Sequence, residues 1–184
     1  TQAASIERPG EVQLRIHVDP TSNINGLEIQ RSDDGLGSWL FSGSIAPNTN
    51  PIIFNDMTAS PNNQSYFYKV TAIDSCNREI LTSQISRTIF LTVTPDQARL
   101  VNLLQWNDYE GFDGAVLGYN IFRIVNDVVA PFPIATIGSG PRYYEDNVEG
   151  YIGSQANGNF CYYVEAIENI NLYGIEERCK SNVA

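Results

Sequence analysis

The sequence has little of what catalysis and metal binding usually require. Its 184 residues include one histidine, His17, and three cysteines without a Cys-x-x-Cys spacing. A Ser-His-Asp or Cys-His site would have to use His17, which we expect on the solvent-facing side of a strand between Ile16 and Val18. A zinc site is disfavoured for the same reason. We therefore predict that the chain is not an enzyme.

Basic residues and long apolar runs are scarce as well. Lys and Arg number 11 against 21 Asp and Glu, which gives a net charge of −10 and a pI near 4.4. Clustered basic side chains bind nucleic acids and anionic membranes, so we expect neither as a partner. No apolar run approaches the roughly 18 residues of a transmembrane helix, so no membrane insertion is expected. Because the sequence begins at Thr1 without Met or a signal-peptide pattern, we expect a longer parent chain.

The apolar residues that are present follow a period of two. Val12, Leu14 and Ile16 alternate with polar neighbours, and the same alternation recurs within residues 65–73 and 159–168. Such alternation is typical of half-buried antiparallel strands, and no stretch shows a convincing 3.6-residue period. Besides a short strand before Pro9, the expected strands span roughly 12–18, 26–32, 38–45, 51–55, 65–73, 80–90, 100–106, 117–125, 132–137, 142–146, 159–168 and 175–182.

Three segments recur in the same order in the two halves of the chain. The pairs are residues 26–31 with 118–123, 65–74 with 159–168 and, less closely, 16–19 with 104–107. A repeat this long indicates domain duplication rather than a solenoid. It predicts one domain over residues 1–94 and a second over residues 95–184. The short apolar connection at 88–94 is expected to hold them in a fixed relation.

The repeated segments resemble fibronectin type III domains. The features are an early Trp106, a middle strand at 119–123, and the late segment Tyr162-Tyr163-Val164-Glu165-Ala166. The resemblance implies that Trp106 packs in a core and that Tyr66 is a corner tyrosine bonded to nearby backbone. Phe160 replaces that tyrosine in the second half, and Val18 takes the tryptophan position in the first. The expected fold class is all-β, with two tandem immunoglobulin-like, fibronectin type III-like β-sandwiches.

A narrower resemblance concerns modules of secreted Bacteroidetes proteins. It is carried by residues 107–112, 117–123, 160–168, 171–174 and 181–182, and in the first half by 74–76 and 87–93. Such modules stand before the type B sorting domain of the type IX secretion system and are linked to gliding motility. The resemblance implies a secreted or cell-surface protein, such as an adhesin. Its implied partners are neighbouring domains of the same chain and, beyond them, outer-membrane or surface proteins or glycans.

The cysteines offer one disulfide hypothesis. Cys161 and Cys179 each lie nine residues from Ile170, so a symmetric hairpin would place them side by side. The resembling modules more often carry the second cysteine after Ser-Asn-x-Ala, which would put the partner of Cys161 beyond Ala184. Cys76 would be free or paired outside this sequence.

Acidic and aromatic loop residues supply the remaining candidates. Asp108, Glu110 and Asp113 follow Trp106 and could hold calcium, although their spacing matches no calcium-loop motif and Gly111 and Gly114 suit an ordinary turn. No other cofactor is expected. Four aromatic residues fall in predicted loops of the second half and could bind a glycan or a protein. Alternatively, they cap the open ends of the sandwich or pack against its neighbour. They are Tyr109, Phe112, Tyr151 and Tyr173.

Together these features favour a non-catalytic structural or interaction module that spaces or presents parts of a larger surface protein. The alternative is a recognition module that binds a glycan or protein through the acidic, aromatic loops of the second domain.

Overall fold

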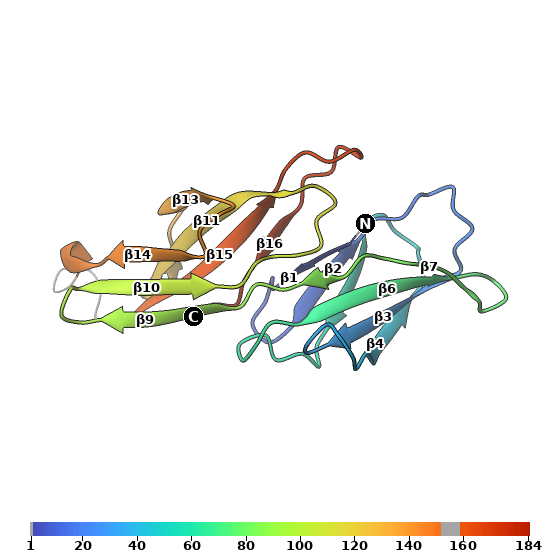
Figure 1. The fold of residues 1–184 in the computed structure, drawn as a ribbon, viewed down its shortest axis with the longest axis horizontal. Helices are drawn as coiled ribbons and strands as arrows, with labels where there is room; N and C mark the ends of the chain where they lie inside the picture. The colour runs from blue at the N-terminus through green and yellow to red at the C-terminus, as the bar shows by residue number, and fades with distance from the viewer. Residues whose placement is uncertain (1, 152–158) are drawn as a thin grey trace.

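The computed structural model describes residues 2–151 and 159–184, which form two β-sandwiches placed end to end (Figure 1). In the first, a sheet of order β1-β2-β5 packs against a sheet of order β4-β3-β6-β7, and β8 also pairs with β6. All pairings are antiparallel. The strands are β1 (Gln2–Ser5), β2 (Val12–Ile16), β3 (Gly26–Ser32), β4 (Leu40–Ile45), β5 (Ile52–Asp56), β6 (Phe67–Ile73), β7 (Glu79–Thr82) and β8 (Ser86–Arg87).

The second sandwich repeats this arrangement. A sheet of order β14-β10-β9 packs against a sheet of order β12-β11-β15-β16, with β13 paired to β11. Its elements are β9 (Leu91–Asp96), β10 (Val101–Trp106), β11 (Val116–Val125), β12 (Val128–Val129), β13 (Ala135–Gly138), β14 (Tyr143–Asn147), the 3-10 turn η1 (Glu149–Tyr151), β15 (Phe160–Glu168) and β16 (Arg178–Lys180). No helix within the described ranges is long and apolar enough to cross a membrane.

The strand orders confirm the predicted fold class, all-β with two fibronectin type III-like sandwiches. Each core lies between two sheets, as the period-two pattern requires, because alternate side chains of a strand point to the same face. Trp106 is buried in the second core, and the hydroxyl of Tyr66 accepts a hydrogen bond from the backbone N–H of Ser60 at 3.2 Å. Both features match the predictions made from the sequence.

The crossing between the sandwiches lies earlier than the predicted boundary between residues 94 and 95. Strand β9 pairs with β10 along its whole length, from Leu91 opposite Trp106 to Asp96 opposite Val101. It therefore belongs to the second sandwich, and that boundary falls inside it. The chain crosses at residues 88–90, where Ile89 is buried in the second core.

The register also corrects one pair of repeated residues. The sequence aligned Val18 with Trp106, but Ile16 lies opposite Ile52 on β5, while Trp106 bonds to the carbonyl of Arg142 just before β14. Ile16 therefore holds the place of Trp106. A slip of two residues keeps every side chain on the same face, so alternation alone could not detect it.

Candidate functional site at the joint between the sandwiches

The contact between the sandwiches, here called the joint, is built around strand β1. All four residues of β1 are buried, although the strand lies at a sheet edge. Its free edge meets β16, where the backbone N–H of Ile6 donates to the carbonyl of Lys180 at 3.0 Å. In return, the N–H of Lys180 donates to the hydroxyl of Ser5 at 2.9 Å. A sheet of the first sandwich thus abuts a sheet of the second edge to edge (Figure 1).

A network of charged side chains covers this edge. Arg15 on β2 contacts Glu177 at 2.7 Å and Glu7 at 3.1 Å, and Lys180 contacts Glu7 at 2.9 Å. Burial opposes ionisation of Glu7, but its bonds from Lys180 and Ser5 and the charge of Arg15 outweigh burial and lower its pKa. His17 lies 2.7 Å from Glu177, so it joins this network rather than facing solvent as the sequence suggested.

Tyr109 and Phe112 are buried, and Tyr109 lies inside the joint, which contradicts their prediction as an exposed binding surface. Their side chains are 4% and 9% exposed, and their ring centroids are 4.2 Å apart. The Tyr109 hydroxyl accepts bonds from the backbone N–H of Ala4 at 3.1 Å and from the Cys179 thiol at 3.3 Å. The alternative reading, that these aromatics pack against the neighbouring domain, describes Tyr109 correctly.

A second contact joins the end of the first sandwich to the same loop, residues 107–115. The N–H of Arg87 donates to the carbonyl of Glu110 at 2.8 Å, and the Gln84 amide donates to the carbonyl of Gly111 at 2.9 Å. Gly111 has a φ of +118°, and a Cβ added there would collide with Ser86. The close approach of the two sandwiches therefore requires glycine at this position.

The proposed calcium ligands do not converge. Asp108 pairs with Arg142, and Glu110 pairs with Arg87 at 3.5 Å. Asp113 instead accepts a bond from the Gln84 amide at 3.2 Å. Within residues 2–151 and 159–184, no three His, Cys, Asp or Glu side chains are grouped as metal ligands. Glu110 and Asp113 thus contact residues of the first sandwich and hold the joint, whereas Asp108 pairs with an arginine of its own sandwich.

The predicted Cys161–Cys179 disulfide is wrong. Cys179 lies opposite Ala166 on β15, five residues from Cys161, and both thiols are free. Five strand residues span about 17 Å, far beyond the reach of a disulfide. The hairpin is not centred on Ile170, as the symmetric prediction assumed. The other hypothesis, a partner beyond Ala184, stays a prediction.

Tyr173 is the one predicted aromatic that remains open to solvent, with 69% of its surface exposed. Tyr151 is half-buried, because the Arg123 guanidinium lies 4.1 Å from its ring centroid and donates to its hydroxyl at 2.6 Å. Tyr173 borders a groove beside the joint that Asp19, Asn50 and Ile175 also line.

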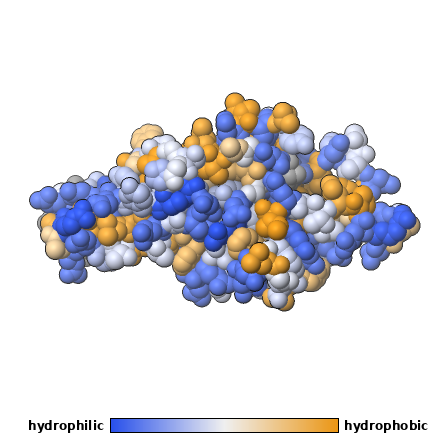
Figure 2. All heavy atoms as spheres, in the orientation of Figure 1, coloured by the Kyte–Doolittle hydropathy of each residue, from blue (hydrophilic) through white to orange (hydrophobic). Residues whose placement is uncertain are grey.

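The loop that carries Tyr173, residues 169–177, also exposes Ile170 and Leu172, and Leu172 is 100% exposed. Apolar spheres mark this loop at the top of the view (Figure 2). The sequence analysis missed Ile170 and Leu172. Their signal was two aliphatic residues that alternate with asparagines in a predicted turn.

No protein-family model and no curated protein matches the sequence. Among solved structures, the chain is similar to the FN1–FN3 domains of chicken CNTN1, with 13% identity and a TM-score of 0.37 over 100% of this chain and 62% of that chain. It is also similar to a segment of two fibronectin type III domains from chicken tenascin, with 11% identity and a TM-score of 0.37 over 100% and 97%. The assignment of the fold rests on the strand order and register described above.

Proposed function

We propose that the chain is a non-catalytic module whose two sandwiches act as one rigid body and hold the parts of a larger protein at a fixed distance and angle. The observation that carries this proposal is the joint. Sandwiches joined by a flexible linker would leave their facing surfaces polar and separate. Here Ala3 of β1 lies in the core of the second sandwich, and the buried Tyr109 of the second sandwich accepts a hydrogen bond from the backbone N–H of Ala4 at 3.1 Å.

The electrostatics of the joint also favour a fixed geometry. Arg15 is bonded at once to Glu7, to Glu177 and to the carbonyl of Arg178, so both sandwiches supply acceptors to one guanidinium. A planar guanidinium with several fixed acceptors restricts rotation more than a single point charge would. Domain rotation would break these bonds together with those of Ser5 and Ile6.

The test is the rotational diffusion of each sandwich, measured by ¹⁵N relaxation on the whole chain. A rigid module requires the amides of both sandwiches to report one diffusion tensor, in agreement with the shape seen by small-angle X-ray scattering. Separate correlation times for the two sandwiches would refute the proposal.

A second candidate function is recognition through the 169–177 loop. Leu172, Ile170 and Tyr173 expose apolar surface beside a groove that also presents the polar side chains of Asp19 and Asn50. Exposed apolar groups rimmed by polar ones are typical of binding sites. We propose glycans as the first ligands to examine, because aromatic rings stack on sugars while amides and carboxylates bond their hydroxyls.

A glycan panel probed with the whole chain tests this second function. The triple variant Ile170→Ser, Leu172→Ser and Tyr173→Ser should lose any glycan bound by the parent, whereas Leu36→Ser, at another exposed position, should retain it. Binding that survives the triple change would place recognition elsewhere.

A proposal for where the protein is located rests on the resemblance of its sequence to type IX secretion modules. We propose a secreted or cell-surface protein, with neighbouring domains of the same chain as its first partners. Antibodies raised against the chain should label intact cells of the source organism. Labelling that requires permeabilised cells would contradict a surface location.

A further inference from the structure

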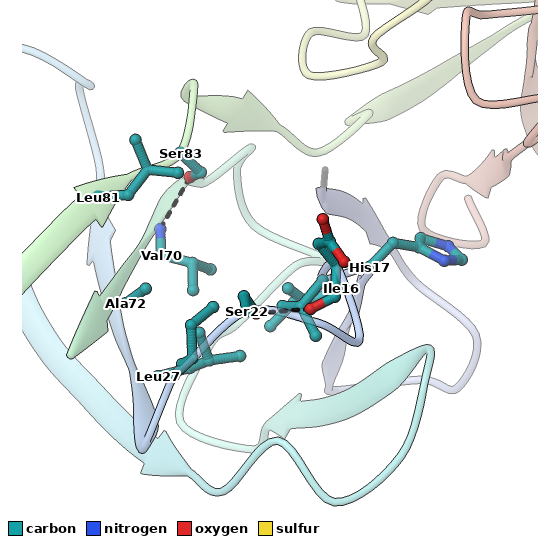
Figure 3. Close-up of a pocket in the computed structure, with 11 residues that line it drawn as sticks. Ile16, His17, Ser22, Leu27, Val70, Ala72, Leu81 and Ser83 are labelled. Atoms are coloured by element: carbon teal, nitrogen blue, oxygen red, sulfur yellow. Dashed lines mark hydrogen bonds between the residues drawn. The ribbon is translucent and has the colours of Figure 1, made fainter. Parts of the chain in front are cut away.

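An apolar groove opens at the end of the first sandwich away from the 107–115 loop. It has a volume of about 240 Å³ and lies between the end of β2, the start of β3, and the strands β6 and β7 (Figure 3). Its walls are largely aliphatic and include Ile16, Leu27, Val70 and Ala72, with Leu81 at the rim. Leu81 is 70% exposed, so the apolar surface of the groove continues to its rim.

The second sandwich contains a counterpart of this groove, residue by residue. The register pairs Leu27 with Ala72 in the first sandwich and Tyr119 with Ala166 in the second. Ala72 in turn faces Leu81, as Ala166 faces Cys179. Leu81 and Cys179 therefore hold equivalent positions on their last strands.

A repeated pair of hydrogen bonds, made by one serine in each sandwich, fixes this equivalence independently. The Ser83 N–H donates to the carbonyl of Val70, and its hydroxyl accepts from the Val70 N–H at 3.0 Å. Ser181 makes the same two bonds with Val164, the second at 2.9 Å. Thr82 in the first sandwich thus corresponds to Lys180 in the second.

In the second sandwich this position is filled and covered. Cys179 is fully buried beneath Tyr109, and the Tyr109 N–H donates to the hydroxyl of Tyr119 at 3.2 Å. Strand β1 of the preceding sandwich closes the site, with Ala3 in the core and the N–H of Ala4 on Tyr109. The counterpart groove in the first sandwich has Leu81 exposed where Cys179 is covered.

We infer that this groove is a docking socket for an extended edge strand of another β-sandwich, bound as β1 is bound in the joint. Thr82 supplies the backbone contact. Because the Ser83 N–H points toward β6, the N–H and C=O of Thr82 point away from it along the edge of β7, as those of Lys180 point toward Ser5 and Ile6. The occupant presents small apolar side chains to Leu81 and a free N–H to Thr82.

A second copy of this chain does not fit that description. In the joint, the Ile6 N–H donates to Lys180. The register of β1 with β2 continues to Ile6, which therefore lies opposite Val12. The counterpart of Val12 in the second sandwich is Asn102, and Asn102 lies opposite Pro95 on β9. The second sandwich therefore has Pro95 at the place of Ile6, and proline has no N–H to donate. The occupant is an edge strand of a different sandwich.

The test uses the whole ¹⁵N-labelled chain and a synthetic peptide that copies residues 1–8, which include the strand β1 that closes the counterpart site. We expect saturable amide shifts at Leu81, Thr82 and Ser83 at millimolar peptide. A peptide with proline in place of its isoleucine should bind about tenfold more weakly, because it lacks one hydrogen bond. Leu81→Ser should weaken binding severalfold, and Ile80→Ser, at the neighbouring exposed residue, should not.

Four results would overturn the inference: no shifts, equal shifts with both peptides, shifts confined to the joint around Lys180, or dimers of the chain formed through the β7 face. Sedimentation of the chain without peptide checks the last result, for which we expect a monomer. This inference goes beyond the proposed function, because two sandwiches can form one rigid body whether or not the groove at the end of the first sandwich binds a partner. Its failure would leave the relaxation test of the joint untouched.

Discussion

The hydroxyl of Tyr162 donates to a carboxylate oxygen of Asp146 at 2.8 Å, across the two sheets of the second sandwich. Tyr68 and Asp56 make the same contact in the first sandwich at 3.0 Å. An arginine completes each set, Arg123 on Asp146 at 2.9 Å and Arg31 on Asp56 at 2.7 Å. In each sandwich, a buried aspartate therefore ties the sheet of its own strand to two strands of the opposite sheet.

Asp56→Asn and Asp146→Asn should each lower the free energy of unfolding by about 3 kcal/mol. The change leaves a largely buried guanidinium, with 14% of the Arg31 side chain and 11% of the Arg123 side chain exposed, without its counter-charge, which costs far more than a surface ion pair contributes. Urea unfolding followed by tryptophan fluorescence measures the effect. Asp33→Asn, at an exposed carboxylate, is the matched control and should leave the transition unchanged. Equal urea midpoints for all three variants would show that these Tyr–Asp–Arg contacts do not stabilise the packing of the two sheets.

Stability should fall in acid through the same carboxylate. Burial opposes ionisation of Asp56, but bonds from Thr58 and Tyr68 and the charge of Arg31 lower its pKa below the usual value. A lowered folded pKa contributes stability above the unfolded value of about 4, and that contribution is lost as pH falls through the folded pKa. Urea midpoints measured from neutral pH downward should therefore decline more steeply for the parent than for Asp56→Asn. Parallel declines would assign the acid sensitivity to other groups.

Gly111→Ala should open the joint without unfolding the sandwiches. The new Cβ meets Ser86 and must adopt a φ that non-glycine residues avoid, at a cost of about 1–3 kcal/mol. ¹⁵N relaxation should then show two correlation times where the parent shows one. Gly37→Ala, where an added Cβ meets nothing within 4 Å, is the control. A variant that still tumbles as one body would mean that the joint tolerates separation at this loop.

Reactivity toward a thiol reagent should distinguish Cys76 from Cys179. Cys76 is exposed and should react at once with a thiol reagent at pH 8. Burial raises the pKa of the Cys179 thiol to about 12 despite the nearby charge of Arg15, so almost no thiolate forms at that pH. Cys179 should react only after unfolding. Protein denatured without reductant should show three reactive thiols. A count of one would show that the Cys161–Cys179 disulfide forms after all.

Much of the fold was accessible from the sequence because period-two alternation and internal repetition are local signals. Tyr66 and Trp106 were placed correctly, since their roles depend on their own strands. The sequence comparison aligned Val18, rather than Ile16, with Trp106. This two-residue slip preserved the period-two alternation, so the alternation could not reveal it. Hairpin symmetry likewise gave no information on the register of β16, so the cysteine pair was misplaced.

The joint was accessible only in part. Its fixed geometry was expected from the short connection, but Tyr109 and Phe112 have the composition of exposed loop aromatics whether or not another domain covers them. The pairing of Arg15 with Glu177 spans 162 residues, and no local pattern reports such a contact. The arginines that pair with Asp108 and Glu110 also come from distant parts of the chain, so the sequence showed only a cluster of unpaired carboxylates.

The bond between Ser5 and Lys180 joins residues 175 positions apart. During synthesis, β1 cannot contact β16 until the second sandwich is nearly complete, because β16 is the last strand of the chain to be made. Until then, one edge of the first sandwich lies open to pairing with other strands. The joint is therefore the last part of the pair to form, and its closure hides the edge on which aggregation would begin.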